Sequence, residues 1–61
     1  MSSGNGFSQR ELEILHMLQS DLSGPEIASR LVVSLNTVRF HTKNIYRKLG
    51  VNTRLEAIRR A

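Results

Sequence analysis

The stretch SLNTVRFHTKNIYRKLG, residues 34–50, decides the fold of this chain. A helix turns by roughly 100° per residue, so apolar side chains three or four positions apart line one face of it. In this stretch such a stripe is formed by Val38, Thr42, Ile45 and Leu49. The spacing predicts a helix over 35–49 with this stripe turned toward a core.

The opposite face of the predicted helix is basic. It holds Asn36 and Phe40 beside three cations spaced four residues apart, namely Arg39, Lys43 and Arg47. Stacked cations without an intervening acid repel each other by about a few tenths of a kcal/mol per pair. Because this arrangement costs helix stability, we expect the face to meet a polyanion, and the phosphates of a nucleic acid are the obvious candidate.

The chain is small, and its length limits what it can do. Its 61 residues fit one domain with a small core, which excludes large clefts and two-domain chemistry. It has no cysteine, so it has no disulfide framework or thiolate metal site and suits a reducing cytoplasm. No apolar run approaches the roughly 20 residues that a membrane span needs.

Charge is unevenly distributed along the chain. Residues 1–33 hold two cations and four acids, a net charge of −2, whereas residues 34–61 hold seven cations and one acid, a net charge of +6. Together they give the formal net charge of +4. A basic face on a compact fold raises the local concentration of nucleic acid or anionic lipid, and charge alone does not choose between them.

Three serine or threonine residues are each followed by a glutamate three positions later, which is the spacing of a capping box at a helix start. The pairs are Ser8 with Glu11, Ser23 with Glu26, and Thr53 with Glu56. With Gly50 as a left-handed helix stop, they predict an all-α, four-helix domain. The helices are expected at about 8–20, 24–32, 35–49 and 53–61.

The shorter helices each offer apolar side chains for the core. The residues expected to face inward are Leu12, Ile14, Leu15, Met17, Leu18, Ile27, Ala28, Leu31, Leu55 and Ile58. Phe7 precedes the first cap and is expected to act as a hydrophobic staple. Residues 1–6 are glycine-rich and polar, so we interpret them as a flexible leader before a domain over 7–61.

The second and third predicted helices are separated only by a tight connection at Val33 and Ser34. A short helix, a tight turn and a longer basic helix make a helix-turn-helix, whose second helix enters the major groove of B-DNA. The sequence therefore predicts a double-stranded DNA-binding domain.

The segments FSQRELEIL and LSGPEIASRLVVSLNTVRFHTKNIYRKLGVNTRLEAI resemble the DNA-binding domain of LuxR-type (LuxR/FixJ) transcription regulators. The match covers nearly the whole chain from Phe7. The resemblance implies a helix-turn-helix domain whose third helix reads the major groove and whose fourth commonly forms a two-fold dimer contact on DNA. In relatives the side chains just after the Thr37–Val38 pair meet base edges, and here these are Arg39, Phe40 and Lys43.

Phosphate contacts are expected at the rim of the same surface. The groups expected to hold the DNA backbone are Ser34, Thr37, Asn44, Arg47, Lys48 and Arg54. The residues expected at a homodimer contact are Leu55, Ile58 and Ala61. Pro25 and Phe40 depart from the side chains common in relatives, which carry a polar residue and a smaller one at these places. Many relatives also carry a receiver or ligand-binding domain upstream.

Other functions find less support in the sequence. No nucleophile stands beside a base, no glycine loop cradles a phosphate, and His16 has no partner at zinc-ligand spacing, so we expect no enzyme, cofactor or metal. Glu11 and Arg54 are expected to form a structural ion pair. The remaining alternative is a protein-interaction module in which the last helix or Phe40 docks on RNA polymerase or a regulatory domain. Membrane binding is disfavoured because the outer helix face offers only Phe40 and Tyr46 for insertion.

Overall fold

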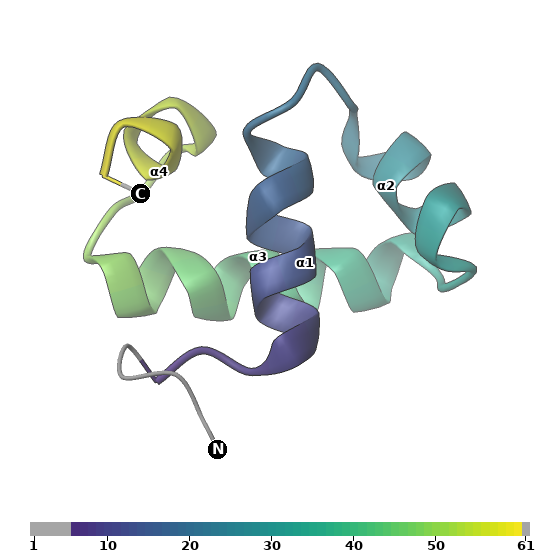
Figure 1. Cartoon of the computed structure of the whole chain (residues 1–61), viewed down its shortest axis with the longest axis horizontal. Helices are drawn as coiled ribbons and strands as arrows, with labels where there is room; N and C mark the ends of the chain where they lie inside the picture. Colours follow the sequence, from purple (N-terminus) through teal and green to yellow (C-terminus); the bar gives the residue numbers. More distant parts are fainter. Residues whose placement is uncertain (1–5, 61) are drawn as a thin grey trace.

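The structure is a computed structural model that describes residues 6–60. In this part of the chain it has four helices and no strand: α1 (Gln9–Leu18), α2 (Gly24–Leu31), α3 (Leu35–Leu49) and α4 (Arg54–Arg60) (Figure 1). The all-α class and the bounds of α3 are confirmed. The other three helices begin or end one or two residues inside the predicted bounds. Most of the expected leader, residues 1–5, lies outside the described residues.

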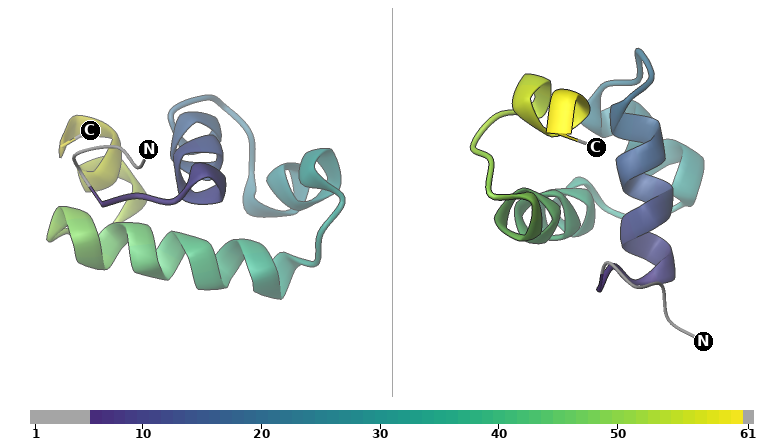
Figure 2. Two further views of the ribbon diagram at one scale, coloured as in Figure 1. Left: turned by 60° about the horizontal axis from the view of Figure 1, so that its bottom comes forward. Right: turned by 60° about the vertical axis from the view of Figure 1, so that its left-hand side comes forward.

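The long helix α3 organises the molecule. It packs against α1, α2 and α4 in turn. In Figure 2 (left) these three helices lie on one side of α3, and the other side of α3 is left uncovered. A single helix thus supplies one wall of the core and a free outer face.

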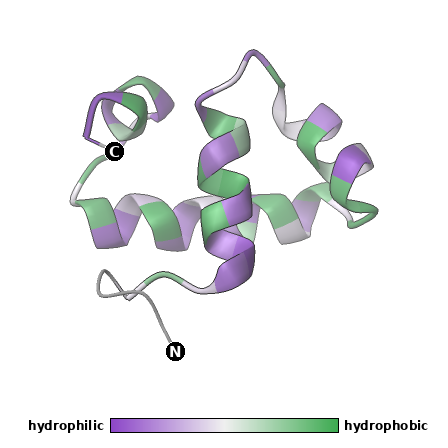
Figure 3. Ribbon diagram, in the orientation of Figure 1, coloured by the Kyte–Doolittle hydropathy of each residue, from purple (hydrophilic) through white to green (hydrophobic). Residues whose placement is uncertain are grey.

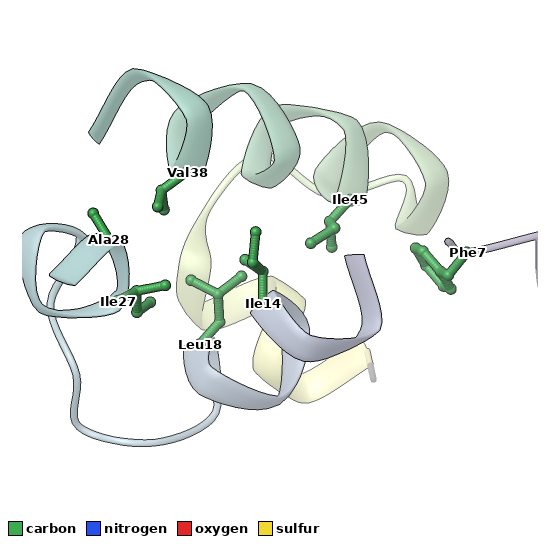
Figure 4. Packing of buried hydrophobic residues seen from close by; sticks show 7 residues of the cluster. All are labelled: Phe7, Ile14, Leu18, Ile27, Ala28, Val38 and Ile45. Atoms are coloured by element: carbon green, nitrogen blue, oxygen red, sulfur yellow. The ribbon is translucent and has the colours of Figure 1, made fainter. Parts of the chain in front are cut away.

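The core lies where α1, α2 and α3 meet (Figure 4). Each of these helices contributes one isoleucine that is fully buried, Ile14, Ile27 or Ile45. The other buried members of the cluster are Phe7, Leu18, Ala28 and Val38. Green apolar segments accordingly alternate with purple polar ones along the helices in Figure 3, the pattern expected of helices buried on one side.

The predicted apolar stripe of α3 is confirmed. Val38 and Ile45 are buried, and Leu49 packs against the core cluster. Thr42 is half-buried beside them. The helix is therefore rotated as its sequence pattern predicts.

The inward residue of α4 differs from the prediction. Ala57 is fully buried, whereas Leu55 is 57% exposed and Ile58 is half-buried. Positions 55 and 57 lie about 200° apart around a helix, so only one of them can face the core. The small alanine takes that place, and the expectation that Leu55 points inward is wrong.

All of the predicted capping boxes form. The backbone N–H of each cap residue donates to the glutamate carboxylate, over 2.9 Å from Ser8 to Glu11 and 2.8 Å from Ser23 to Glu26. The equivalent hydrogen bond from Thr53 to Glu56 is 3.2 Å long. Each cap contributes about 1 kcal/mol, which matters in a domain of this size.

Two helices end on a residue with left-handed backbone. Gly50 stops α3 with φ of 72°, as predicted from glycine's freedom at positive φ. Val32 stops α2 with φ of 58°, although valine is β-branched and disfavours this conformation. Val32 was expected inside the helix, and its left-handed backbone is what ends α2 at Leu31.

Candidate nucleic-acid interface

The outer face of α3 is built from exposed side chains. Arg39, Lys43 and Arg47 are exposed, and Phe40 exposes 62% of its surface. Asn36 is exposed in the first turn of the same helix. The structure thus brings the three residues expected to contact bases together on one accessible surface, opposite the buried stripe.

Phe40 is held by one ring contact. Its ring meets that of His41 edge-to-face, with centroids 5.4 Å apart and planes at 68°. His41 is half-buried, and its Nδ1 atom has no hydrogen-bond partner among the residues the structure describes. Such an edge-to-face pair restricts the Phe40 ring while leaving its outer side free for another apolar group.

The first turn of α3 carries free donors without an acid. Ser34 caps the helix and accepts a hydrogen bond of 3.1 Å from the backbone N–H of Thr37. The hydroxyl oxygens of Ser34 and Thr37 lie 3.0 Å apart. No acidic residue occupies this first turn, whereas α1, α2 and α4 each hold a glutamate there. The positive end of the α3 dipole is therefore available to an external anion.

Farther along α3, Asn44 and Arg47 form a polar pair. The Arg47 guanidinium donates to the Asn44 side-chain oxygen over 3.2 Å at an exposed site. This contact orients Arg47 while leaving most of its donors free. Arg47 thus extends the basic surface toward the C-terminal end of the helix.

Lys48 is held by contacts within the chain. Its Nζ atom donates to Glu11 Oε1 over 2.6 Å and to the carbonyl oxygen of Gly6 over 2.9 Å. The same atom lies 5.5 Å from the centre of the Phe7 ring. Lys48 therefore fastens the segment before α1 to the end of α3.

Glu11 is a buried acid, and Lys48 is its ionic partner. The residue is only 5% exposed. The Lys48 hydrogen bond, followed by that from the Ser8 backbone, lowers the pKa of Glu11 below its usual value of 4.5. The expected Glu11–Arg54 ion pair is therefore wrong, because the tertiary fold brings Lys48 rather than Arg54 to this carboxylate.

Arg54 has a different structural contact. Its Nε donates to the carbonyl oxygen of Leu18 and its terminal nitrogen to that of Ser20, each over 3.0 Å. Leu18 is the last residue of α1, where a helix leaves carbonyl groups unpaired, and Ser20 lies in the turn that follows. Arg54 thus joins the start of α4 to the end of α1.

Tyr46 is expected from the sequence on the outer face of α3, but it does not lie there. It is half-buried and packs against the core cluster. Burial raises the pKa of its hydroxyl above 10.0. Along α3, Phe40 is then the exposed large hydrophobic residue among those described.

Two of the three residues expected at a homodimer contact lie within the described part of the chain. Leu55 is exposed, and Ile58 is half-buried next to it in α4. Ala61 lies outside the described residues. Within residues 6–60 no cluster of three or more metal-ligating side chains occurs, and no helix has the length and apolarity needed to span a membrane.

Residues 5–61 match the family model described as bacterial regulatory proteins, luxR family. The chain belongs to this family. The luxR-family chain is also 41% identical over 54 residues to the HTH-type transcriptional regulator MalT of Serratia proteamaculans (strain 568), covering 88% of this chain. It matches the regulators of the same name from Yersinia pestis and from Yersinia pseudotuberculosis serotype O:3 to the same extent.

The chain spans only 6% of the length of these relatives. No solved structure matches it with significance. The likeness to MalT thus concerns only a short, helix-turn-helix part of that regulator. The resemblance to LuxR-type regulators predicted from the sequence is confirmed by the family match.

Proposed function

We propose that this chain binds double-stranded DNA sequence-specifically as part of a transcription regulator, with α3 in the major groove. The observation that carries the proposal is the exposed basic face of α3, formed by Arg39, Phe40, Lys43 and Arg47 opposite a buried stripe. The family and the relatives named as transcriptional regulators support it.

The residues have distinct proposed roles. Arg39 and Lys43 donate to guanine O6 and N7, and the outer side of Phe40 lies against a thymine methyl. Ser34, Thr37, Asn44 and Arg47 hold phosphates, which fixes the register of the helix without reading sequence. We propose that Lys48 and Arg54, whose charged groups already have partners, act on the backbone mainly through their charge.

We further propose that two copies bind an inverted repeat through α4. Leu55 supports this because it is the exposed large hydrophobic residue of that helix. One leucine with a half-buried Ile58 offers little apolar area, so the dimer should form on DNA and dissociate without it.

Selection of binding sites from randomised duplexes tests the proposal. We expect a two-fold motif to be enriched, with half-sites centred about one helical turn, roughly 10 base pairs, apart. Enrichment of a single motif without a two-fold repeat would support sequence-specific binding and contradict the proposed dimer. Recovery of no motif, with equal affinity for all duplexes, would contradict sequence-specific binding.

A further inference from the structure

A groove runs beside the basic face of α3 where parts of all the described helices meet. Its volume is about 510 Å³, so the expectation that a chain of this length excludes a large cleft is wrong. The end of α1 contributes Leu18, the start of α2 contributes Pro25, and α3 contributes Leu35, Val38 and Tyr46. Pockets of roughly 300–1,000 Å³ with a mainly apolar lining are those that hold small organic molecules. The groove is thus large enough for a ligand of two or three fused or linked rings.

The rim of this groove is positively charged. Arg39, Lys43 and Arg54 line it, and no acidic residue is among its lining residues in the described part of the chain. Arg39 and Lys43 are exposed, so their charged groups remain free for a ligand, while Arg54 donates to the carbonyls of Leu18 and Ser20. An anion placed here would meet two free cations above an apolar floor.

Charge complementarity decides the chemistry of the occupant. Inorganic phosphate would use the cations and leave the apolar floor wet, whereas a neutral hydrocarbon would cover the floor and leave the cations unpaired. A flat aromatic carboxylate would both cover the apolar floor and pair with the cations. Its rings would lie on Pro25, Leu35 and Tyr46, and its carboxylate would accept hydrogen bonds from Lys43 or Arg39. We propose that this groove binds a small organic anion of that kind.

Binding there would compete with DNA. This part of the inference rests on the proposed function, since it is Arg39 and Lys43 that would contact both the carboxylate and the base edges. A ligand that occupies these two side chains lowers the affinity for a specific duplex, and a bound duplex excludes the ligand. The groove would then let a small metabolite act directly on the DNA-reading helix.

Titration of the full chain with naphthoate, followed by backbone amide chemical shifts, tests the site. We expect saturable shifts clustered at the start of α2 and along α3 from Leu35 to Tyr46. Naphthamide, which has the rings without the charge, and acetate, which has the charge without the rings, should each bind about tenfold more weakly or worse. Shifts that never saturate, or that cluster elsewhere, would overturn the site.

Matched variants locate the binding further. Leu35→Gln alters a half-buried groove residue outside the core cluster, and Leu55→Gln is its control away from the groove. Lys43→Gln removes a rim cation, and Arg47→Gln removes a cation of the same helix that does not line the groove. We expect the two groove variants to raise the naphthoate Kd about five- to tenfold and the two controls less than about twofold. Equal effects within either pair would contradict the proposal.

A competition experiment separates this inference from the proposed function. Naphthoate bound to the wild-type chain should be displaced by a selected duplex, in proportion to DNA occupancy. Simultaneous binding of both would overturn the competition. If no duplex binds the chain at all, the proposed function fails, while the naphthoate titration still decides whether the groove is a ligand site.

Discussion

Single side chains join distant parts of this small domain. Lys48 connects the end of α3 to Glu11 and to the Gly6 carbonyl, and Arg54 connects α4 to the end of α1. These contacts link residues 34 to 42 positions apart. A local sequence pattern cannot identify contacts between residues so far apart in the chain. The ionic partner predicted for Glu11 is therefore wrong, whereas its capping box with Ser8 is confirmed.

Lys48→Met should destabilise the fold. It leaves the buried Glu11 carboxylate without its cation, and we expect a loss of about 1–2 kcal/mol in the free energy of unfolding, since Lys48 itself is partly exposed. Urea denaturation measures this change. The double variant Glu11→Gln, Lys48→Met is the control, and it should recover part of the loss. A single variant as stable as wild type would contradict the structural role of Lys48.

The stability of the domain should fall in acid. The pKa of Glu11 in the folded chain is lowered by Lys48 and by the Ser8 backbone, so its carboxylate stabilises the fold above its unfolded pKa of about 4.5. That stabilisation is lost as the pH falls from about 4.5 through the folded pKa. Backbone hydrogen bonds, from Ser23 to Glu26 and from Asn52 and Thr53 to Glu56, also lower the pKa of these two carboxyl groups. Their contribution to stability is therefore lost in acid as well.

Comparison of Glu11→Gln with wild type isolates this contribution. Unfolding by urea at pH 6 and at successively lower pH should show a smaller loss of stability in the variant than in the wild type. A residual slope from Glu26 and Glu56 should remain in both. Identical slopes would mean that Glu11 has its ordinary pKa in the folded chain.

At the scale of the element, most of the fold could be predicted because its determinants are local. The capping boxes lie within four residues, and the stripe of α3 repeats within one helix, so a helical wheel places both. The inward residue of α4 could not be placed in this way. A seven-residue helix offers several apolar positions, and only docking against the other helices selects Ala57.

Val32→Gly should stabilise the domain. Left-handed backbone costs an L-residue about 1–2 kcal/mol, and glycine avoids this cost. Glycine also makes the unfolded chain more flexible, which lowers stability by about 0.5–1 kcal/mol. We therefore expect the free energy of unfolding to rise by about 0.5–1 kcal/mol. Val32 is 88% exposed, so little packing is lost. Thermal unfolding should show a midpoint a few degrees higher.

Gly50→Ala provides the opposite control at the other left-handed helix end. A Cβ at Gly50 would meet no atom within 4 Å, so the cost is that of the backbone alone. We expect a loss of about 1 kcal/mol. Destabilisation by Val32→Gly, or no effect of Gly50→Ala, would show that these backbone conformations are not the ones that end α2 and α3.

At the scale of the whole molecule, the three other helices support one side of α3 and leave its basic side open (Figure 2). The candidate site could largely be predicted from sequence, since exposure of Arg39, Phe40 and Lys43 follows from the rotation of a single helix. The groove beside α3 could not, because it is formed by residues of separate helices. The half-buried place of Tyr46 was missed for the same reason.

Leu55→Glu should remove cooperative binding to an inverted repeat. The charge would disrupt an apolar α4 contact between two copies, so the affinity for the full repeat should fall to that for a half-site, by about tenfold or more. Gel-shift titrations on full and half-sites measure this. The control is Arg59→Gln, at an exposed position of the same helix, which should leave the cooperativity unchanged. Glu56 is not used for this purpose because its carboxylate caps α4. Unchanged cooperativity in Leu55→Glu would place the dimer contact elsewhere.

Base reading by the outer face of α3 is tested most directly by comparing Lys43→Ala with Arg47→Ala on a selected duplex and on a scrambled one at several salt concentrations. We expect Lys43→Ala to weaken specific binding by about 1–3 kcal/mol and to change non-specific binding far less. Arg47→Ala should weaken both about equally and reduce the salt slope by about one. Equal losses on both duplexes for Lys43→Ala, or no association of wild type with any duplex at low salt, would contradict the account.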